Sequence, residues 1–109
     1  SSDLKNHLRV LMRLNRYCKK VESIAPAANL EYIRELTATI FTSQMKIYIS
    51  FPLKSGMKKE AIKLDAYFYH KNREVYEKVK NPAVLILRKT RYSVFPLAVL
   101  AFKSRRNSY

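Results

Sequence analysis

A long apolar segment, AANLEYIRELTATIFTSQMKIYIS at residues 27–50, is the feature from which we predict the architecture of this chain. Lys46 is the single charged residue between positions 36 and 53, and bulky apolar residues recur around most of a helical circumference. A helix that is apolar nearly all round belongs in a core or in a membrane. Threonine, serine and glutamine interrupt the run at positions 37–44, whereas a membrane span needs about 20 mostly apolar residues. We therefore expect a buried central helix.

The segments on either side also have helical spacing. Residues 3–23 place leucines at positions 4, 8 and 11 opposite a row of basic residues, which predicts an amphipathic basic helix. After Pro52 and a short loop, we predict helices over residues 58–70 and 73–79. Asn81 and Pro82 are a cap and first-turn pair that begins a last helix, and Pro96 is expected to kink or break it near Phe95. The fold class predicted for residues 1–109 is a single all-α domain of four to five helices around the central apolar helix, ending in an amphipathic basic helix.

The net charge indicates a polyanionic partner. The chain has 22 lysines and arginines against 8 aspartates and glutamates, a formal net charge of +14. Such an excess destabilises a compact state by self-repulsion, so it is best understood as serving nucleic acid, an anionic membrane or an acidic protein surface. One continuous basic stripe on the folded surface would favour a polyanion, whereas dispersed charge would favour a role in solubility.

The sequence contains no recognisable catalytic or metal-binding pattern. His7 and His70 lie far apart without a partner at helical spacing, and Cys18 has no evident oriented base, so we expect ordinary histidines and a core cysteine. A single glycine rules out a glycine-rich phosphate loop. The aromatic run at positions 67–69 suits either base stacking or core packing by Phe68, and core packing is preferred. We assign no catalytic, metal or cofactor residue to this region.

The segment from Asn81 to Tyr109 is predicted to bind an anionic membrane surface. It has two short apolar blocks and no acidic residue. Basic amphipathic helices with aromatic residues lie in the headgroup region of anionic membranes, although the same pattern also fits a helix packed on the domain core. The residues expected to supply the positive charge are Arg88, Lys89, Arg91, Lys103, Arg105 and Arg106. The residues expected to insert are Phe95, Leu97 and Phe102.

Two stretches give the chain a family resemblance. The first is TIFTSQMKIY at positions 39–48, which continues into Phe51 and Pro52, and the second is LRKTRY at positions 87–92, followed by FPL at 95–97. Residues 30–103 resemble the helical region that follows the catalytic domain of bacterial family 2 glycosyltransferases. These enzymes transfer a sugar from a nucleotide-sugar to a glycan or lipid-linked acceptor, with a metal held by an Asp-x-Asp motif. This chain lacks that motif, since its aspartates are Asp3 and Asp65.

The resemblance implies a role rather than an activity. We expect a C-terminal accessory domain, attached to a catalytic domain absent from this sequence, that works in cell-surface polysaccharide synthesis. Its location would be cytoplasmic and peripheral, at the inner face of the cell membrane. The alternative, which depends on the net charge and on the basic helix near the N-terminus, is a helical nucleic-acid-binding module.

Overall fold

The computed structural model describes the backbone of residues 2–52 and 56–107, and the side chains of residues 4–52 and 56–102. This part of the chain is all-α and contains no strand. The six helices are α1 (Ser2–Val21), α2 (Ala27–Ser50), α3 (Met57–Lys71), α4 (Arg73–Lys78), α5 (Pro82–Lys89) and α6 (Phe95–Asn107).

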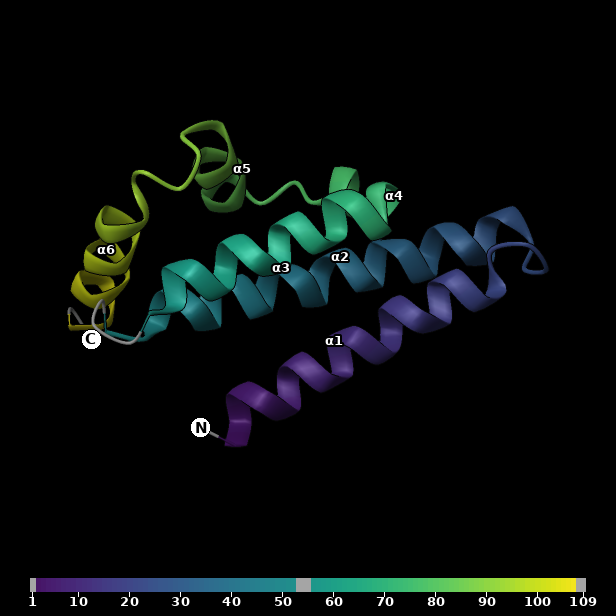
Figure 1. Cartoon of the computed structure of the whole chain (residues 1–109), viewed down its shortest axis with the longest axis horizontal. Coiled ribbons are helices and arrows are strands. Elements are labelled where there is room, and N and C mark those ends of the chain that lie inside the picture. Colours follow the sequence, from purple (N-terminus) through teal and green to yellow (C-terminus); the bar gives the residue numbers. More distant parts are fainter. Residues whose placement is uncertain (1, 53–55, 108–109) are drawn as a thin grey trace.

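Helix α2 lies at the centre, as its composition predicts. Figure 1 shows α1 and α3 along its length, α4 beside the end of α3, and α6 at the end where α2 finishes. Its buried side chains lie at helical spacing on one broad side of the helix and include Phe41, Met45 and Tyr48. The Phe41 ring meets that of Phe68 from α3 edge to face, with 5.2 Å between centroids, which is a favourable geometry for aromatic pairs.

The helices begin and end at proline, glycine and capping asparagine residues of the sequence. Pro26 precedes α2, and Gly56, with φ of +77°, precedes α3 in a left-handed conformation that suits glycine. The side chain of Asn72 caps α4, and that of Asn81 caps α5 with Pro82 as the next residue. The Asn72 amide also donates to Asn15 Oδ1 at 2.8 Å, a buried contact that ties the start of α4 to α1.

The last segment was expected to kink or break near Phe95, and it is divided into two helices, α5 and α6, so that the described residues form six helices rather than the four to five predicted. Helix α5 ends where Tyr92 N–H donates to the Leu87 carbonyl and Arg91 N–H donates to the Arg88 carbonyl. This is a Schellman motif, and Arg91, with φ of 54°, occupies the left-handed position that glycine usually fills. Pro96 then lies in the first turn of α6, where its missing N–H costs nothing. The break therefore comes from the turn at residues 90–94, and Pro96 helps to begin the next helix.

Candidate functional site

Helices α5 and α6 expose apolar side chains on their outer faces. Val84 and Leu87 of α5 are buried, so Leu85 and Ile86 are left in solvent. In α6 the inward residues are Phe95 and Val99. The residues called here the C-terminal apolar surface are Leu85, Ile86, Leu97, Leu100 and Phe102.

The packing of α6 against α2 determines which residues of α6 face outward. Phe95 and Val99 are one helical turn apart and bury their side chains. Leu97 and Leu100 lie on the opposite side and are 65% and 55% exposed. Lys89, at the end of α5, and Arg91, in the turn that follows, are also exposed. Leucines and cations therefore share the outer faces of this region.

Arg88, predicted as a surface cation, is an interior residue, and that assignment is corrected. Its side chain is 11% exposed, and its Nη2 atom lies 2.8 Å from Asp65 Oδ1. Its Nη1 group donates to the Tyr76 carbonyl at 2.9 Å, and its guanidinium lies over the Tyr76 ring. Arg88 follows the buried Val84 by four residues, so helical phase places it on the same side of α5. The helical phase was the one sequence signal for the burial of Arg88. Its partner Asp65 could not be identified in this way, because it lies 23 residues away in the sequence.

Phe95, predicted to insert into a membrane, is 2% exposed and belongs to the core, so this assignment is also corrected. The physical reason is again helical phase, because Phe95 and Val99 are one turn apart on the side of α6 that turns toward the protein. Leu97 and Phe102 remain exposed, as do Lys89 and Arg91. The side chains of Lys103, Arg105 and Arg106 lie outside the described residues.

A buried polar cluster holds the start of this region against α3. The Tyr92 hydroxyl donates to Asp65 Oδ2 at 2.8 Å, and Asp65 also accepts from Arg88 Nε at 3.0 Å. Burial raises the pKa of the Tyr92 phenol far above its ordinary value, and the negative Asp65 carboxylate raises it further. Burial is also the main cause of the raised pKa of Tyr76. The cluster fixes α5 on the body of the domain and was not predicted from the sequence.

A second charged feature lies on α1. Five basic residues follow one another at spacings of four, four, three and four residues, which keeps them on one face of the helix. All five are exposed, and none forms an ion pair with another described residue. The α1 ridge, as this row is called below, consists of Lys5, Arg9, Arg13, Arg16 and Lys20.

The α1 ridge is straight and faces away from the core. Leu11 and Cys18, on the other side of the helix, are buried where α1 packs on α2. At 1.5 Å per residue, the ridge is about 22 Å long. In Figure 1, α1 and α5 lie on opposite sides of the α2–α3 pair. The α1 ridge and the α5 part of the C-terminal apolar surface are thus two separate surfaces.

Other predictions concern single residues. Cys18 is buried, with its Sγ 3.2 Å from Thr37 Oγ1, as expected of a core cysteine. His7 is half-buried and its ring contacts Gln44, whereas His70 is exposed. Phe68 is a core residue with Tyr67 and Tyr69 at the rim, which confirms the preferred interpretation of that aromatic run. Within the described residues, no three His, Cys, Asp or Glu side chains gather closely enough to hold a metal ion.

No family model, curated protein or solved structure matches this chain. No helix in the described ranges 2–52 and 56–107 combines the length and apolarity needed to cross a bilayer. Function is therefore inferred from the two surfaces and from the charge that they carry.

Proposed function

We propose that this chain is a non-catalytic domain that attaches a larger enzyme to an anionic membrane surface through α5 and α6. The observation that carries the proposal is the exposure of Leu97 and Leu100 on α6, close in sequence to the exposed cations Lys89 and Arg91. Helices that present leucine together with lysine or arginine lie in the headgroup region of anionic membranes.

The expected affinity is that of a reversible attachment. Removing a leucine side chain from water contributes up to about 2 kcal/mol, and each cation near an anionic surface contributes about 1 kcal/mol. Leu85 and Ile86 on α5 add apolar area to the same segment of the chain. Arg88 and Phe95 take no part in this surface, because the Arg88 guanidinium is paired with Asp65 and the Phe95 side chain is buried.

The parent enzyme is proposed from the resemblance described above. A glycosyltransferase whose acceptor is linked to lipid needs its catalytic domain close to the membrane, and a domain that binds lipid headgroups would supply that proximity. The partner of this chain would then be the catalytic domain of the same polypeptide, and the sugar chemistry would belong to that domain. Sequencing the complete gene tests this part: an upstream domain with an Asp-x-Asp motif supports it, and its absence contradicts it.

Co-sedimentation with vesicles tests the membrane attachment. The chain is mixed with phosphatidylcholine vesicles, with and without phosphatidylglycerol, at low and high salt. We expect binding to the anionic vesicles, and we expect part of that binding to remain at high salt, because salt does not screen apolar insertion. Replacing Leu97 and Leu100 by serine should weaken binding at least about tenfold and should abolish the binding that remains at high salt.

A matched control replaces two exposed apolar residues elsewhere. Ile24, which is 77% exposed, follows the end of α1, and Tyr32, also exposed, lies near the start of α2. Helix α6 lies at the other end of α2 (Figure 1). The Ile24→Ser, Tyr32→Ser double variant should bind vesicles like the unaltered chain. If both double variants lose binding equally, or if neither does, attachment through α6 is wrong.

The α1 ridge supports a second candidate function, binding of single-stranded nucleic acid. Its five cations form one uninterrupted stripe of the kind that suits a polyanion. Titration of a labelled single-stranded oligonucleotide at several salt concentrations tests this candidate. Replacing Arg9, Arg13 and Arg16 by glutamine should lower the slope of log affinity against log salt by about 2.

A charge-matched control is available on α3. Replacing Lys58, Lys59 and Lys63 by glutamine removes the same charge from another helix. If this variant weakens nucleic-acid binding as much as the α1 variant, net charge alone explains the binding and the α1 ridge is not a site. If the chain does not bind the oligonucleotide at low salt, this second candidate is wrong.

A further inference from the structure

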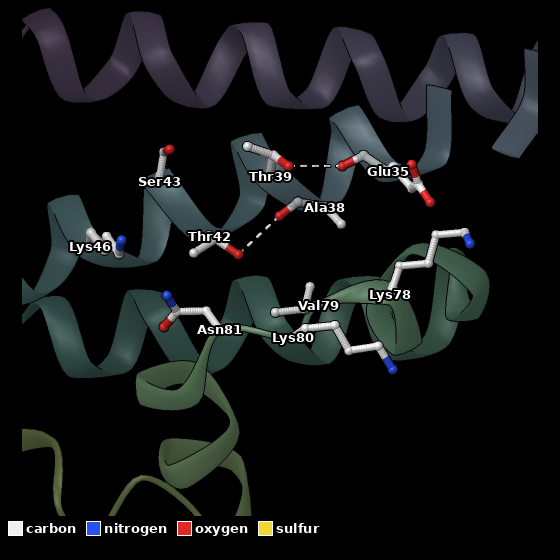
Figure 2. A pocket seen from close by; sticks show the side chains of 10 residues that line it. All are labelled: Glu35, Ala38, Thr39, Thr42, Ser43, Lys46, Lys78, Val79, Lys80 and Asn81. Atoms are coloured by element: carbon white, nitrogen blue, oxygen red, sulfur yellow. Dashed lines mark hydrogen bonds between the residues drawn. The ribbon is translucent and has the colours of Figure 1, made fainter. Parts of the chain in front are cut away.

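A polar groove runs between α2 and the connector that joins α4 to α5. Its volume is about 590 Å³, within the range of about 300–1,000 Å³ that is usual for ligand sites. Figure 2 shows α2 along one side and residues 78–81 along the other. Ala38 and Val79 also line it, and both are buried members of the hydrophobic core, so each wall is anchored in the body of the domain.

The α2 wall offers hydrogen-bond acceptors. The Thr39 hydroxyl donates its hydrogen to the Glu35 carbonyl at 3.0 Å, and the Thr42 hydroxyl donates to the Ala38 carbonyl at 3.0 Å. Both hydroxyl hydrogens are thus engaged, and the remaining lone pairs accept hydrogen bonds. The Glu35 carboxylate, at the same wall, is an acceptor only. A ligand that fits this wall must bring its own donors.

The opposite wall and the far end of α2 offer donors. The Asn81 Oδ1 atom accepts from the backbone N–H groups of Ala83 and Val84 at 3.0 and 3.3 Å, so its amide hydrogens remain for another partner. In Figure 2 the Asn81 amide nitrogen points across the groove toward α2. Lys46 and Lys80 line the groove and form no ion pair with a described residue.

Lys78 is not counted among these donors, because its ammonium is paired with the carboxylate of Glu31 on α2. Lys80 lines the groove, but in Figure 2 its ammonium points away from α2, so the available donors are the Lys46 ammonium and the neutral Asn81 amide. This combination suits a phosphate group, which takes hydrogen bonds from several donors.

We propose that the groove binds a phosphorylated polyol. The hydroxyl groups of such a ligand would donate to Thr39, Thr42 and Glu35, and its phosphate would accept from Lys46 and the Asn81 amide. A single-stranded nucleic acid fits less well, because the residues that line the groove include no aromatic side chain on which a base would stack. The ligand is either a free sugar phosphate or the phosphorylated polyol headgroup of a phospholipid, which present the same chemistry. The inference does not depend on membrane attachment through α6.

Titration followed by amide NMR spectra tests the site. The probes are glucose 1-phosphate, glucose and inorganic phosphate, each added to the 109-residue chain, and separately bicelles that contain phosphatidylinositol. We expect glucose 1-phosphate to shift amide signals of α2 residues 35–46 and connector residues 78–81, and to bind at least about tenfold more tightly than either half alone. Signals that shift only with the phosphatidylinositol bicelles, at the same residues, assign the ligand to a headgroup.

Three variants distinguish the parts of the site. Lys46→Gln removes a cation, and Asn81→Asp keeps a good cap for α5 while replacing the amide donors with a carboxylate. Each should weaken glucose 1-phosphate binding at least about fivefold. Thr42→Val removes an acceptor and should weaken glucose 1-phosphate without affecting inorganic phosphate. Lys58→Gln, on α3 and away from the groove, is the charge-matched control and should change nothing.

The proposal is overturned if no probe shifts the groove signals, or if inorganic phosphate binds as tightly as glucose 1-phosphate. It is also overturned if Lys58→Gln weakens binding as much as Lys46→Gln, since net charge would then explain the affinity. Loss of vesicle binding in the Leu97→Ser, Leu100→Ser variant with groove shifts retained leaves this proposal supported, so the two proposals fail separately.

Discussion

Arg88 and Asp65 form an ion pair in the interior of the domain and join α5 to α3. The Arg88 Nη2 atom lies 2.8 Å from Asp65 Oδ1, and the side chains are 11% and 8% exposed. The pair is supported on both sides, because Tyr92 donates to Asp65 and the Arg88 Nη1 group donates to the Tyr76 carbonyl. Removing one member of a buried pair leaves the other charge without compensation.

Asp65→Asn should therefore destabilise the domain strongly. The variant keeps the size of the side chain but leaves the Arg88 guanidinium buried without a carboxylate. We expect the free energy of unfolding to fall by about 3–5 kcal/mol. Urea unfolding followed by circular dichroism measures the change.

Glu60→Gln is the control for this prediction. Glu60 lies on the same helix, and its carboxylate is 4.0 Å from the Lys63 ammonium, with both side chains well exposed. Exposed pairs of this kind contribute less than about 1 kcal/mol. Equal losses in the two variants would show that the Asp65 pair behaves as a surface pair and would contradict the interpretation.

The raised pKa of Tyr92 should make the domain less stable at alkaline pH. Its pKa is raised in the folded state by burial and then by Asp65, above the ordinary value of 10.0. Because the folded chain holds this proton after the unfolded chain has released it, the stability is fully present below about pH 10 and declines above it. The slope for one proton is about 1.4 kcal/mol per pH unit.

Tyr92→Phe should remove that part of the alkaline slope. At neutral pH the variant loses the hydrogen bond to Asp65, a charged acceptor, which costs about 1.5–3 kcal/mol. Unfolding curves recorded between pH 8 and 11, in steps of about one pH unit around the ordinary tyrosine pKa, measure both the loss of stability and the alkaline slope. An alkaline slope that is unchanged in Tyr92→Phe would assign the titration to other groups, of which Tyr48 and Tyr76 also have raised pKa values.

The bounds of the central helix were predictable because a proline precedes it and another follows it. Pro26 and Pro52 bracket the apolar segment, and the observed bounds, Ala27–Ser50, are those that were predicted. The starts of α3, α4 and α5 also follow from local signals, namely a glycine and two capping asparagines. Local chemistry was sufficient wherever the residue that ends or begins a helix is of the usual type.

The turn after α5 was missed because its key residue is unusual. A Schellman motif normally places glycine in the left-handed position, and here the position is held by Arg91. The burial of Arg88 was missed for a different reason. Its partner Asp65 lies on another helix, and no local pattern in α5 indicates a carboxylate contributed by α3.

Arg91→Gly should stabilise the fold. A non-glycine residue in the left-handed region costs about 1–2 kcal/mol, and glycine returns about 0.5–1 kcal/mol of that as greater freedom of the unfolded chain. The net gain expected is up to about 1 kcal/mol, measured by urea unfolding. Lys89→Gly, in the last turn of α5, is the matched control and should destabilise by about 1 kcal/mol. A loss of stability in Arg91→Gly would mean that the Arg91 side chain makes a contribution larger than the backbone strain.

The two capping asparagines should differ in what their removal costs. Asn81 is half-exposed and only caps α5, so Asn81→Ala should destabilise by about 1 kcal/mol. Asn72 is buried, caps α4 through Val75 N–H and donates to Asn15 Oδ1. Asn72→Ala removes both contacts and leaves the buried Asn15 amide without its partner, which adds about 1–3 kcal/mol. Parallel urea unfolding of the two variants measures the difference, and equal losses would show that the contact between α4 and α1 contributes nothing to stability.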